Sequence, residues 1–216
     1  MSVADLLEED LHEPSGPRVL GVTPATVIDN LDAEGQGRVQ VSFPWIPDVL
    51  PWARMCAPVA GSGAGVWALP QIGDEVLVAF ANGDVTHPYV LGGLWSLFSR
   101  PPAPLPTDAQ TKRVIKTPTG HAIILDDVPP AITIEHLAGH KVEITATAIK
   151  LSTAGGAASI ELTAAGEVKV KGTTAVQVGA PDVKIAGDIA AKVTGGASVE
   201  LSASGCLLYT SPSPRD

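Results

Sequence analysis

The chain has 216 residues, of which 45% are hydrophobic, and it carries a net charge of −9 at pH 7. This length allows one large domain or two small ones, and the hydrophobic content argues against a chain that is disordered as a whole. The acidic balance argues against nucleic acid as a partner, because phosphate groups would be repelled. No apolar run approaches the roughly 18–20 residues that a membrane-spanning helix needs, so membrane insertion is not expected.

The first 17 residues are predicted to form an arm. Leucines are spaced there for one side of a short helix, which Pro14 and Pro17 would end. Two interpretations stay open, namely a solvated terminus and a docking helix for a partner. The segment is acidic where a secretory signal would be basic and then apolar, so no signal peptide is expected.

Residues 18–98 are predicted to be all-β and to form a small barrel or sandwich. The sequence GRVQVSF alternates and places Val39, Val41 and Phe43 on one face of a strand. The Asn82-Gly83 pair predicts a tight type I′ turn. Further short strands are expected within residues 52–59, 65–70, 75–81 and 87–95.

A Pro-rich linker is expected at residues 99–110, followed by a repeated short unit over residues 111–205. Eight aromatic residues precede residue 99 and none lies between 99 and 205, so the interior of the second part is expected to be narrow. Apolar pairs spaced by two residues recur there between small residues and turns. The pairs are Ile132/Ile134, Val142/Ile144, Ile149/Leu151, Ile160/Leu162, Val168/Val170, Val176/Val178, Val183/Ile185 and Val199/Leu201.

Each repeated unit buries too little to fold alone. Two aliphatic side chains contribute about 3–6 kcal/mol on burial, at 1.5–3 kcal/mol each. Ordering about eight residues costs roughly 8–16 kcal/mol of backbone entropy. Stacked units must supply the difference, which predicts a β-solenoid. A triangular coil of one chain and one face of a prism shared by three chains both satisfy the pattern.

The sequence GRVQVSFPW at residues 37–45 resembles the spike family of contractile injection machines, which includes phage baseplate assembly protein V and VgrG-type spikes. The resemblance continues over residues 53–95, around a core that runs from Pro70 through GDEVLVAFANGD to Pro88. The sequence KTPTGHAIILDD, at residues 116–127, is similar to the start of the family's needle. The similarity covers about residues 18–200.

The resemblance implies an OB-type barrel at residues 18–98 and a homotrimeric, intertwined β-helix, or β-prism, over residues 111–205. It thereby favours three chains over one. It also implies that the apolar pairs form a trimer core. The predicted core residues are Val142, Ile144, Ile149, Leu151, Ile160, Leu162, Val168, Val170, Val176, Val178, Val183, Ile185, Val199 and Leu201.

The function that this resemblance implies is that of a non-enzymatic spike, assembled in the cytoplasm into a virion or injection particle, that caps a tail tube and punctures the target envelope. The implied partners are two sister copies, a baseplate or tail hub protein, the tail tube and a PAAR-type tip cap. A β-solenoid carbohydrate-active enzyme and a bactofilin-like structural polymer are the alternatives. No cofactor is expected, although a tip metal is possible in a missing C-terminus.

Residues that could carry chemistry have simpler interpretations. His136 and His140 are expected to be solvated rather than metal ligands, and Asp126-Asp127 to lie in a polar loop. Cys56 is expected to be a small core residue. The last residues, CLLYTSPSPRD at 206–216, resemble a translated sequencing adapter and are interpreted as an artefact tail.

Overall fold

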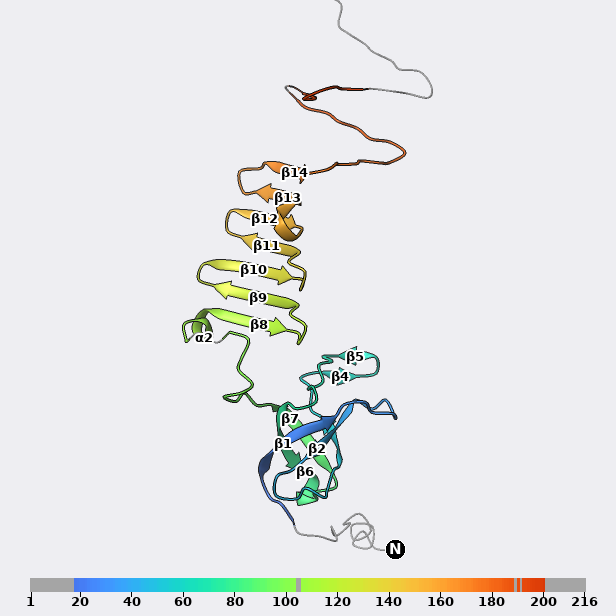
Figure 1. Cartoon of the computed structure of the whole chain (residues 1–216), viewed down its shortest axis with the longest axis vertical. Helices are drawn as coiled ribbons and strands as arrows, with labels where there is room; N and C mark the ends of the chain where they lie inside the picture. Colours follow the sequence, from blue (N-terminus) through green and yellow to red (C-terminus); the bar gives the residue numbers. More distant parts are fainter. Residues whose placement is uncertain (1–17, 104–105, 189, 191, 201–216) are drawn as a thin grey trace, which may run out of the picture.

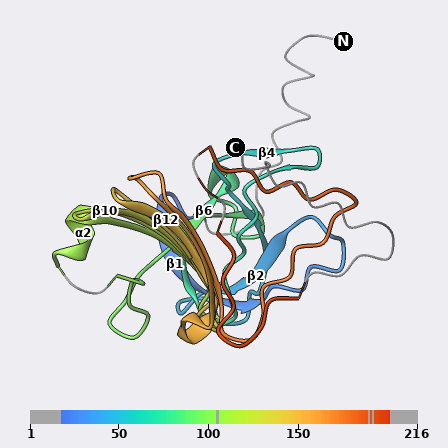
Figure 2. The same cartoon turned by 90° about the horizontal axis from the view of Figure 1, so that it is seen from above.

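The computed structural model describes residues 18–103, 106–188, 190 and 192–200. The predicted arm at residues 1–17 and the tail at residues 206–216 lie outside the described residues. The described chain consists of a closed barrel, followed by a single curved sheet (Figure 1 and Figure 2). The prediction of an all-β chain is confirmed.

Five strands close the barrel in the order β1-β2-β3-β7-β6. All neighbouring pairs are antiparallel except β3 and β7, which run parallel. A 3-10 turn, η1 (Ala81–Gly83), lies between the two barrel strands that come last in the chain. The barrel strands are β1 (Val22–Asp29), β2 (Arg38–Ser42), β3 (Trp52–Met55), β6 (Glu75–Phe80) and β7 (Pro88–Gly93).

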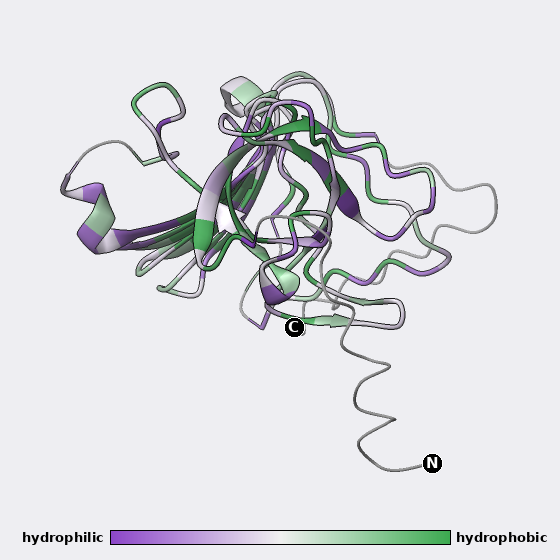
Figure 3. Ribbon diagram, turned by 90° about the horizontal axis from the view of Figure 1, so that it is seen from below, coloured by the Kyte–Doolittle hydropathy of each residue, from purple (hydrophilic) through white to green (hydrophobic). Residues whose placement is uncertain are grey.

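The barrel encloses its own hydrophobic core. The predicted face of Val39, Val41 and Phe43 is confirmed, because all three side chains are 0% exposed. The rings of Phe43 and Phe80 pack with their centroids 5.3 Å apart. Buried and less buried positions alternate along β2 and β6, so that one set of side chains faces inward and the other faces out. Figure 3 colours the ribbon by the hydropathy of each residue.

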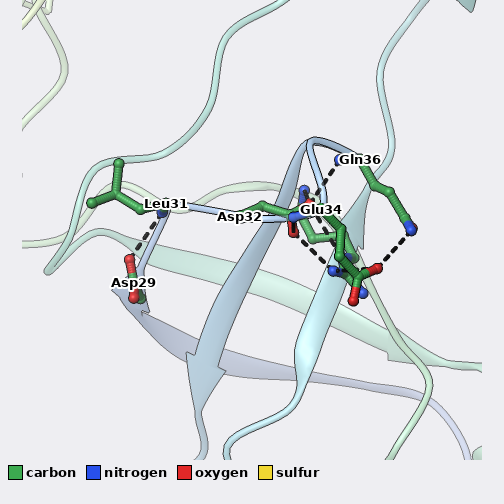
Figure 4. A network of polar contacts seen from close by, with 6 residues as sticks. Asp29, Leu31, Asp32, Glu34 and Gln36 are labelled. Atoms are coloured by element: carbon green, nitrogen blue, oxygen red, sulfur yellow. Dashed lines mark hydrogen bonds and ion pairs between the residues drawn. The ribbon is translucent and has the colours of Figure 1, made fainter.

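The turn between β1 and β2 is held by the carboxylate of Asp32 (Figure 4). This carboxylate accepts a hydrogen bond from Arg38 Nη2 at 2.8 Å and others from the backbone N–H groups of Glu34 and Gln36. The Arg38 side chain, followed by these N–H groups, holds the pKa of Asp32 well below its usual range. The network fixes the loop and the entry into β2.

The Asn82-Gly83 turn is confirmed, within a longer loop. Asn82 has φ 51° and Gly83 has φ 82°, and both values lie in the left-handed region that such a turn requires. Asp84 N–H donates to the carbonyl of Ala81 at 2.8 Å and closes the turn. The chain reaches β7 only at Pro88, after a second turn.

Three details of the barrel differ from the sequence predictions. Strand β1 was not predicted, and the segment 65–70 contributes only β5 (Ala64–Gly65), which pairs with β4 (Ala60–Gly61) in a small hairpin. Cys56 is exposed rather than in the core, because the chain leaves the barrel wall directly after β3. The prediction of a core cysteine is therefore wrong.

The second part is a seven-stranded antiparallel sheet in which each strand neighbours the next one in the chain. One helical turn, α2 (Asp108–Thr111), precedes it, and a 3-10 turn, η2 (Ala154–Gly156), joins two of its strands. The strands are β8 (Lys112–Lys116), β9 (Ala122–Asp127), β10 (Pro130–Glu135), β11 (Lys141–Thr145), β12 (Ala148–Ser152), β13 (Ala158–Thr163) and β14 (Val168–Gly172).

This meander differs from a single-chain coil. Consecutive strands reverse direction, whereas the coil would turn corners in one sense. The described residues beyond Gly172 form no strand. Within the described part of the chain, no helix is long and apolar enough to cross a membrane.

Candidate trimerisation surface

The apolar pairs of neighbouring strands lie in register on one face of the sheet. Each pair opposes the next, as Ile144 opposes Ile149 and Leu151 opposes Ile160. The face therefore carries two columns that run across the strands. The first column is Ile115, Ile123, Ile134, Val142, Leu151, Ile160 and Val170, and the second is Leu125, Ile132, Ile144, Ile149, Leu162 and Val168. We call these two columns the apolar face.

The apolar face is open in the single chain. Ile144 is 39% exposed, Leu151 is 44% exposed and Val168 is 65% exposed. The exposed fractions of the inward side chains of the barrel are, by contrast, near zero. A groove of about 550 Å³ follows the first column, past Val142, Leu151 and Ile160. A contiguous aliphatic surface of this extent is typical of an interface, because each side chain gains about 1.5–3 kcal/mol on burial.

Threonines at the turns hold the strands in this register. Thr117, Thr145, Thr153 and Thr163 each end a strand or directly follow one. Each hydroxyl oxygen accepts a backbone N–H from across its turn at 2.9–3.1 Å. Because a slip of one residue would turn every aliphatic side chain to the other face, these bonds protect the apolar face. This role of the threonines was not predicted from the sequence, although a threonine near each of these strand ends was the available signal.

The opposite face of the sheet is polar. Its middle column alternates in charge, with Glu143, Lys150, Glu161 and Lys169 directly opposite one another on successive strands. Hydrogen bonding to Glu167, 2.8 Å away, and the charges of Glu167 and Glu161 raise the pKa of Lys169. The sheet thus has one face suited to water and one face that needs a cover.

The four predicted core pairs from residue 142 to residue 170 all lie on the apolar face, and the apolar pair Ile132/Ile134 lies there too. The pairs Val176/Val178 and Val183/Ile185, with Val199, lie in the described segment without strands. Leu201 lies outside the described residues. Burial of these side chains between sister chains stays a prediction.

Residues considered for chemistry are placed at the edges of the molecule. His121, His136 and His140 lie in the turns that join strands of the sheet. The ring centroids of His121 and His136 are 4.5 Å apart, and those of His136 and His140 are 5.7 Å apart. The Nδ1 atoms of His136 and His140 accept backbone N–H groups at 3.1 Å, which is a turn-holding role. No cluster of three or more potential ligands suited to a metal occurs among the described residues.

Asp126 and Asp127 end strand β9 rather than lying in a polar loop, so that prediction is wrong. In the barrel, Thr86, His87 and Asp84 are in contact, but both Thr86 Oγ1 and Asp84 Oδ2 approach the same ring nitrogen, Nδ1, at 3.0 and 2.9 Å. A nucleophilic triad needs one partner on each nitrogen. This group is therefore a turn and not a catalytic triad.

The fold defines a class of protein in which an OB-type barrel precedes an open sheet, and one face of that sheet is suited to an interface. Comparison with known families agrees with this class. Residues 23–95 match the type VI secretion system/phage-baseplate injector OB domain, and residues 112–177 match the phage baseplate V C-terminal trimerisation domain. Together the two matches cover more than half of the chain. The chain belongs to the family of baseplate V and VgrG-type spike proteins.

Three curated relatives illustrate the similarity. "Actin cross-linking toxin VgrG1" and "Type VI secretion system spike protein VgrG3", both from Vibrio cholerae, are 35% identical over 113 residues, or 48% of this chain. "Type VI secretion system spike protein VgrG2a" from Pseudomonas aeruginosa is 34% identical over 117 residues, again 48% of this chain. The matched part is only 10–14% of the length of these relatives.

Proposed function

We propose that this chain is the non-enzymatic central spike subunit of a contractile injection machine. Three copies would pack their apolar faces against one another to form a needle that caps the tube and punctures the target envelope. The observation that carries the proposal is the register of the two aliphatic columns, open in one chain and located within the trimerisation match. The relatives support a spike over a β-solenoid enzyme or a bactofilin-like polymer.

The mechanical role follows from the direction of the backbone hydrogen bonds. The strands of the sheet are stacked one above the other along its length (Figure 1), so the hydrogen bonds between strands run along that length. A load along the needle would therefore be borne by many such hydrogen bonds together and by the packed aliphatic interior that the three chains share. Unfolding would require all three chains to separate at once, which favours the slow unfolding of a kinetically stable rod.

The proposal assigns the parts of the chain to separate tasks. The barrel, with bounds proposed at residues 18–98, would seat the trimer on a hub protein at the end of the tail tube. The linker at residues 99–110 would join it to the needle at residues 111–205, whose tip would take a PAAR-type cap. The assembled particle, a virion or an injection apparatus, would be the site of action.

The oligomeric mass of the full chain tests this proposal. We expect a trimer by analytical ultracentrifugation. Ile144→Asp or Leu151→Asp should abolish it, because three carboxylates would meet in an apolar interior at a cost of several kcal/mol per ion. Ser152→Asp is the matched control, since its side chain lies on the polar face, opposite Lys141. A folded monomer of the unmodified chain, or a trimer of Leu151→Asp, would contradict the shared core.

A further inference from the structure

A second surface, on the outside of the barrel, combines arginine with aromatic rings. The side chains come from β2, β3 and the start of β7, and they border a groove of about 640 Å³. Arg38 lies directly opposite Arg54, which in turn lies opposite Tyr89. The Arg38 guanidinium stands 5.8 Å from the centre of the Trp52 ring, and that of Arg54 stands 5.8 Å from the centre of the Tyr89 ring. We call this surface the arginine groove.

The two arginines of the groove differ in their partners. Arg38 is paired with Asp32 at 2.8 Å and Glu34 at 3.0 Å. Arg54 is exposed and has no carboxylate within 4.0 Å among the described residues, although Asp48 also borders the groove. A guanidinium stacked on a ring keeps its N–H edge available, and that edge suits a carboxylate. The groove therefore lacks an acidic partner at Arg54.

The groove also offers apolar surface. Leu50 is 43% exposed and Tyr89 36%, and Trp52, on whose ring the Arg38 guanidinium stands, is half-buried. A chain segment that fits must present carboxylates and aliphatic side chains together. Single-stranded nucleic acid would also stack on the rings, but a run of phosphates needs several free cations, and Arg54 is the one arginine of the groove without a carboxylate partner among the described residues.

One segment of this chain has that composition, and it joins the barrel at a loop whose other residues border the groove. Residues 1–17 contain five acidic residues, no lysine or arginine, and leucines at positions 6, 7 and 11. At the first described residues, Val19 N–H donates to the carbonyl of Gly83 at 2.9 Å. Gly83 belongs to the loop between β6 and β7, and Thr86 and His87 of the same loop border the groove. Seventeen residues can span up to about 55 Å when extended, which is ample to cross that loop.

We propose that residues 1–17 dock in the arginine groove, with their carboxylates on Arg54 and their leucines against Leu50, Trp52 and Tyr89. The acidic arm then acts as an internal ligand of the barrel. It covers an aromatic surface that would otherwise face water in every copy of the chain.

Hydrogen exchange of the full-length protein tests the docking. We expect the amides of residues 4–12 to exchange at least tenfold more slowly than in a free peptide of the same sequence. Arg54→Glu should remove this protection, and Arg54→Gln, which removes the charge and keeps a shorter polar side chain, should remove most of it. Arg100→Glu is the matched control at an exposed arginine of the linker and should leave it unchanged. Exchange at the free-peptide rate in the unmodified chain, or protection that survives both Arg54 variants, overturns the proposal.

A photo-crosslink identifies the occupant. Gln36 lies exposed at the border of the groove, so a photoreactive phenylalanine analogue at this position samples whatever binds there. Crosslinked peptides from residues 1–17 support the proposal. Crosslinks to another segment of the chain, to a different protein or to an added oligothymidine overturn it.

Discussion

The barrel and the sheet solve the problem of burial in opposite ways. In the barrel the strands close on themselves, and the inward side chains of Val41, Phe43 and Val78 are 0% exposed in a single chain. In the sheet the corresponding side chains, such as Ile149 and Leu162, remain 43% exposed, because no second layer covers them. One chain therefore suffices to enclose the barrel core, whereas the same chain leaves the aliphatic side chains of the sheet uncovered.

Tryptophan fluorescence can separate the two regions experimentally. All four tryptophans, at positions 45, 52, 67 and 95, belong to the barrel half of the chain, and the sheet contains none. Fluorescence therefore reports unfolding of the barrel, and sedimentation reports assembly through the sheet.

The largest expected effect is the loss of the barrel core without loss of the trimer. Phe43→Ala removes a fully buried ring that packs against Phe80, which should destabilise the barrel by about 3–5 kcal/mol. The urea midpoint of tryptophan fluorescence should fall accordingly, while the sedimentation mass stays that of a trimer. A monomer of Phe43→Ala would show that the barrel is needed for assembly and would break the comparison.

A smaller effect is expected from acid. Hydrogen bonds from the Thr86 backbone and hydroxyl, followed by His87, lower the pKa of Asp84 to about 2 from an ordinary value of 3.8. Because the unfolded chain takes up this proton first, the stabilisation is complete above pH 3.8 and is lost as the pH falls toward 2. The barrel's fluorescence midpoint should therefore decrease between pH 5 and pH 2.5.

Asp84→Asn should make that decrease shallower, whereas Asp48→Asn, at an exposed carboxylate of the same barrel, should not. The same slope in all three proteins would assign the acid sensitivity to other groups, such as Asp32.

The smallest expected effect sharpens the assignment of the two sheet faces. Lys150→Glu places like charges directly opposite Glu143 and Glu161, at a cost of about 0.2–1 kcal/mol for each pair. We expect sedimentation to show that the trimer persists but dissociates at a slightly lower urea concentration, and Lys150→Gln to show about half of the change. Dissociation of Lys150→Glu would mean that the polar face also lies in an interface.

Periodicity made most of the fold predictable. The strand at Val39 and Val41 and the aliphatic pairs of the sheet follow a strict two-residue spacing that only strands satisfy. Strand β1 was missed because it buries only Ala25 and Val27 and contains Pro24, which weakens the strand signal. Pairing with β2 begins at Thr26, so Pro24 lies where the strand has one neighbour.

The sequence could not supply the register between strands. The alternating charges from Glu143 to Lys169 become a column only when each turn has its actual length, and those lengths differ from one turn to the next. Trp67 likewise could not be assigned from pattern alone, because it lies in no strand and covers Gly37 from a distant loop. Contacts of this kind depend on closure of the barrel and not on local spacing.

The up-and-down order of the sheet also bears on how needles of different reach could arise. A duplicated hairpin inserted between two existing strands brings the chain back to the side of the sheet at which the insertion began. Both aliphatic columns then continue without a break. Each such insertion lengthens the rod by about 9–10 Å at constant width. A single strand inserted between two others would instead reverse the direction of every strand that follows, so insertions within the sheet preserve the columns only in pairs of strands.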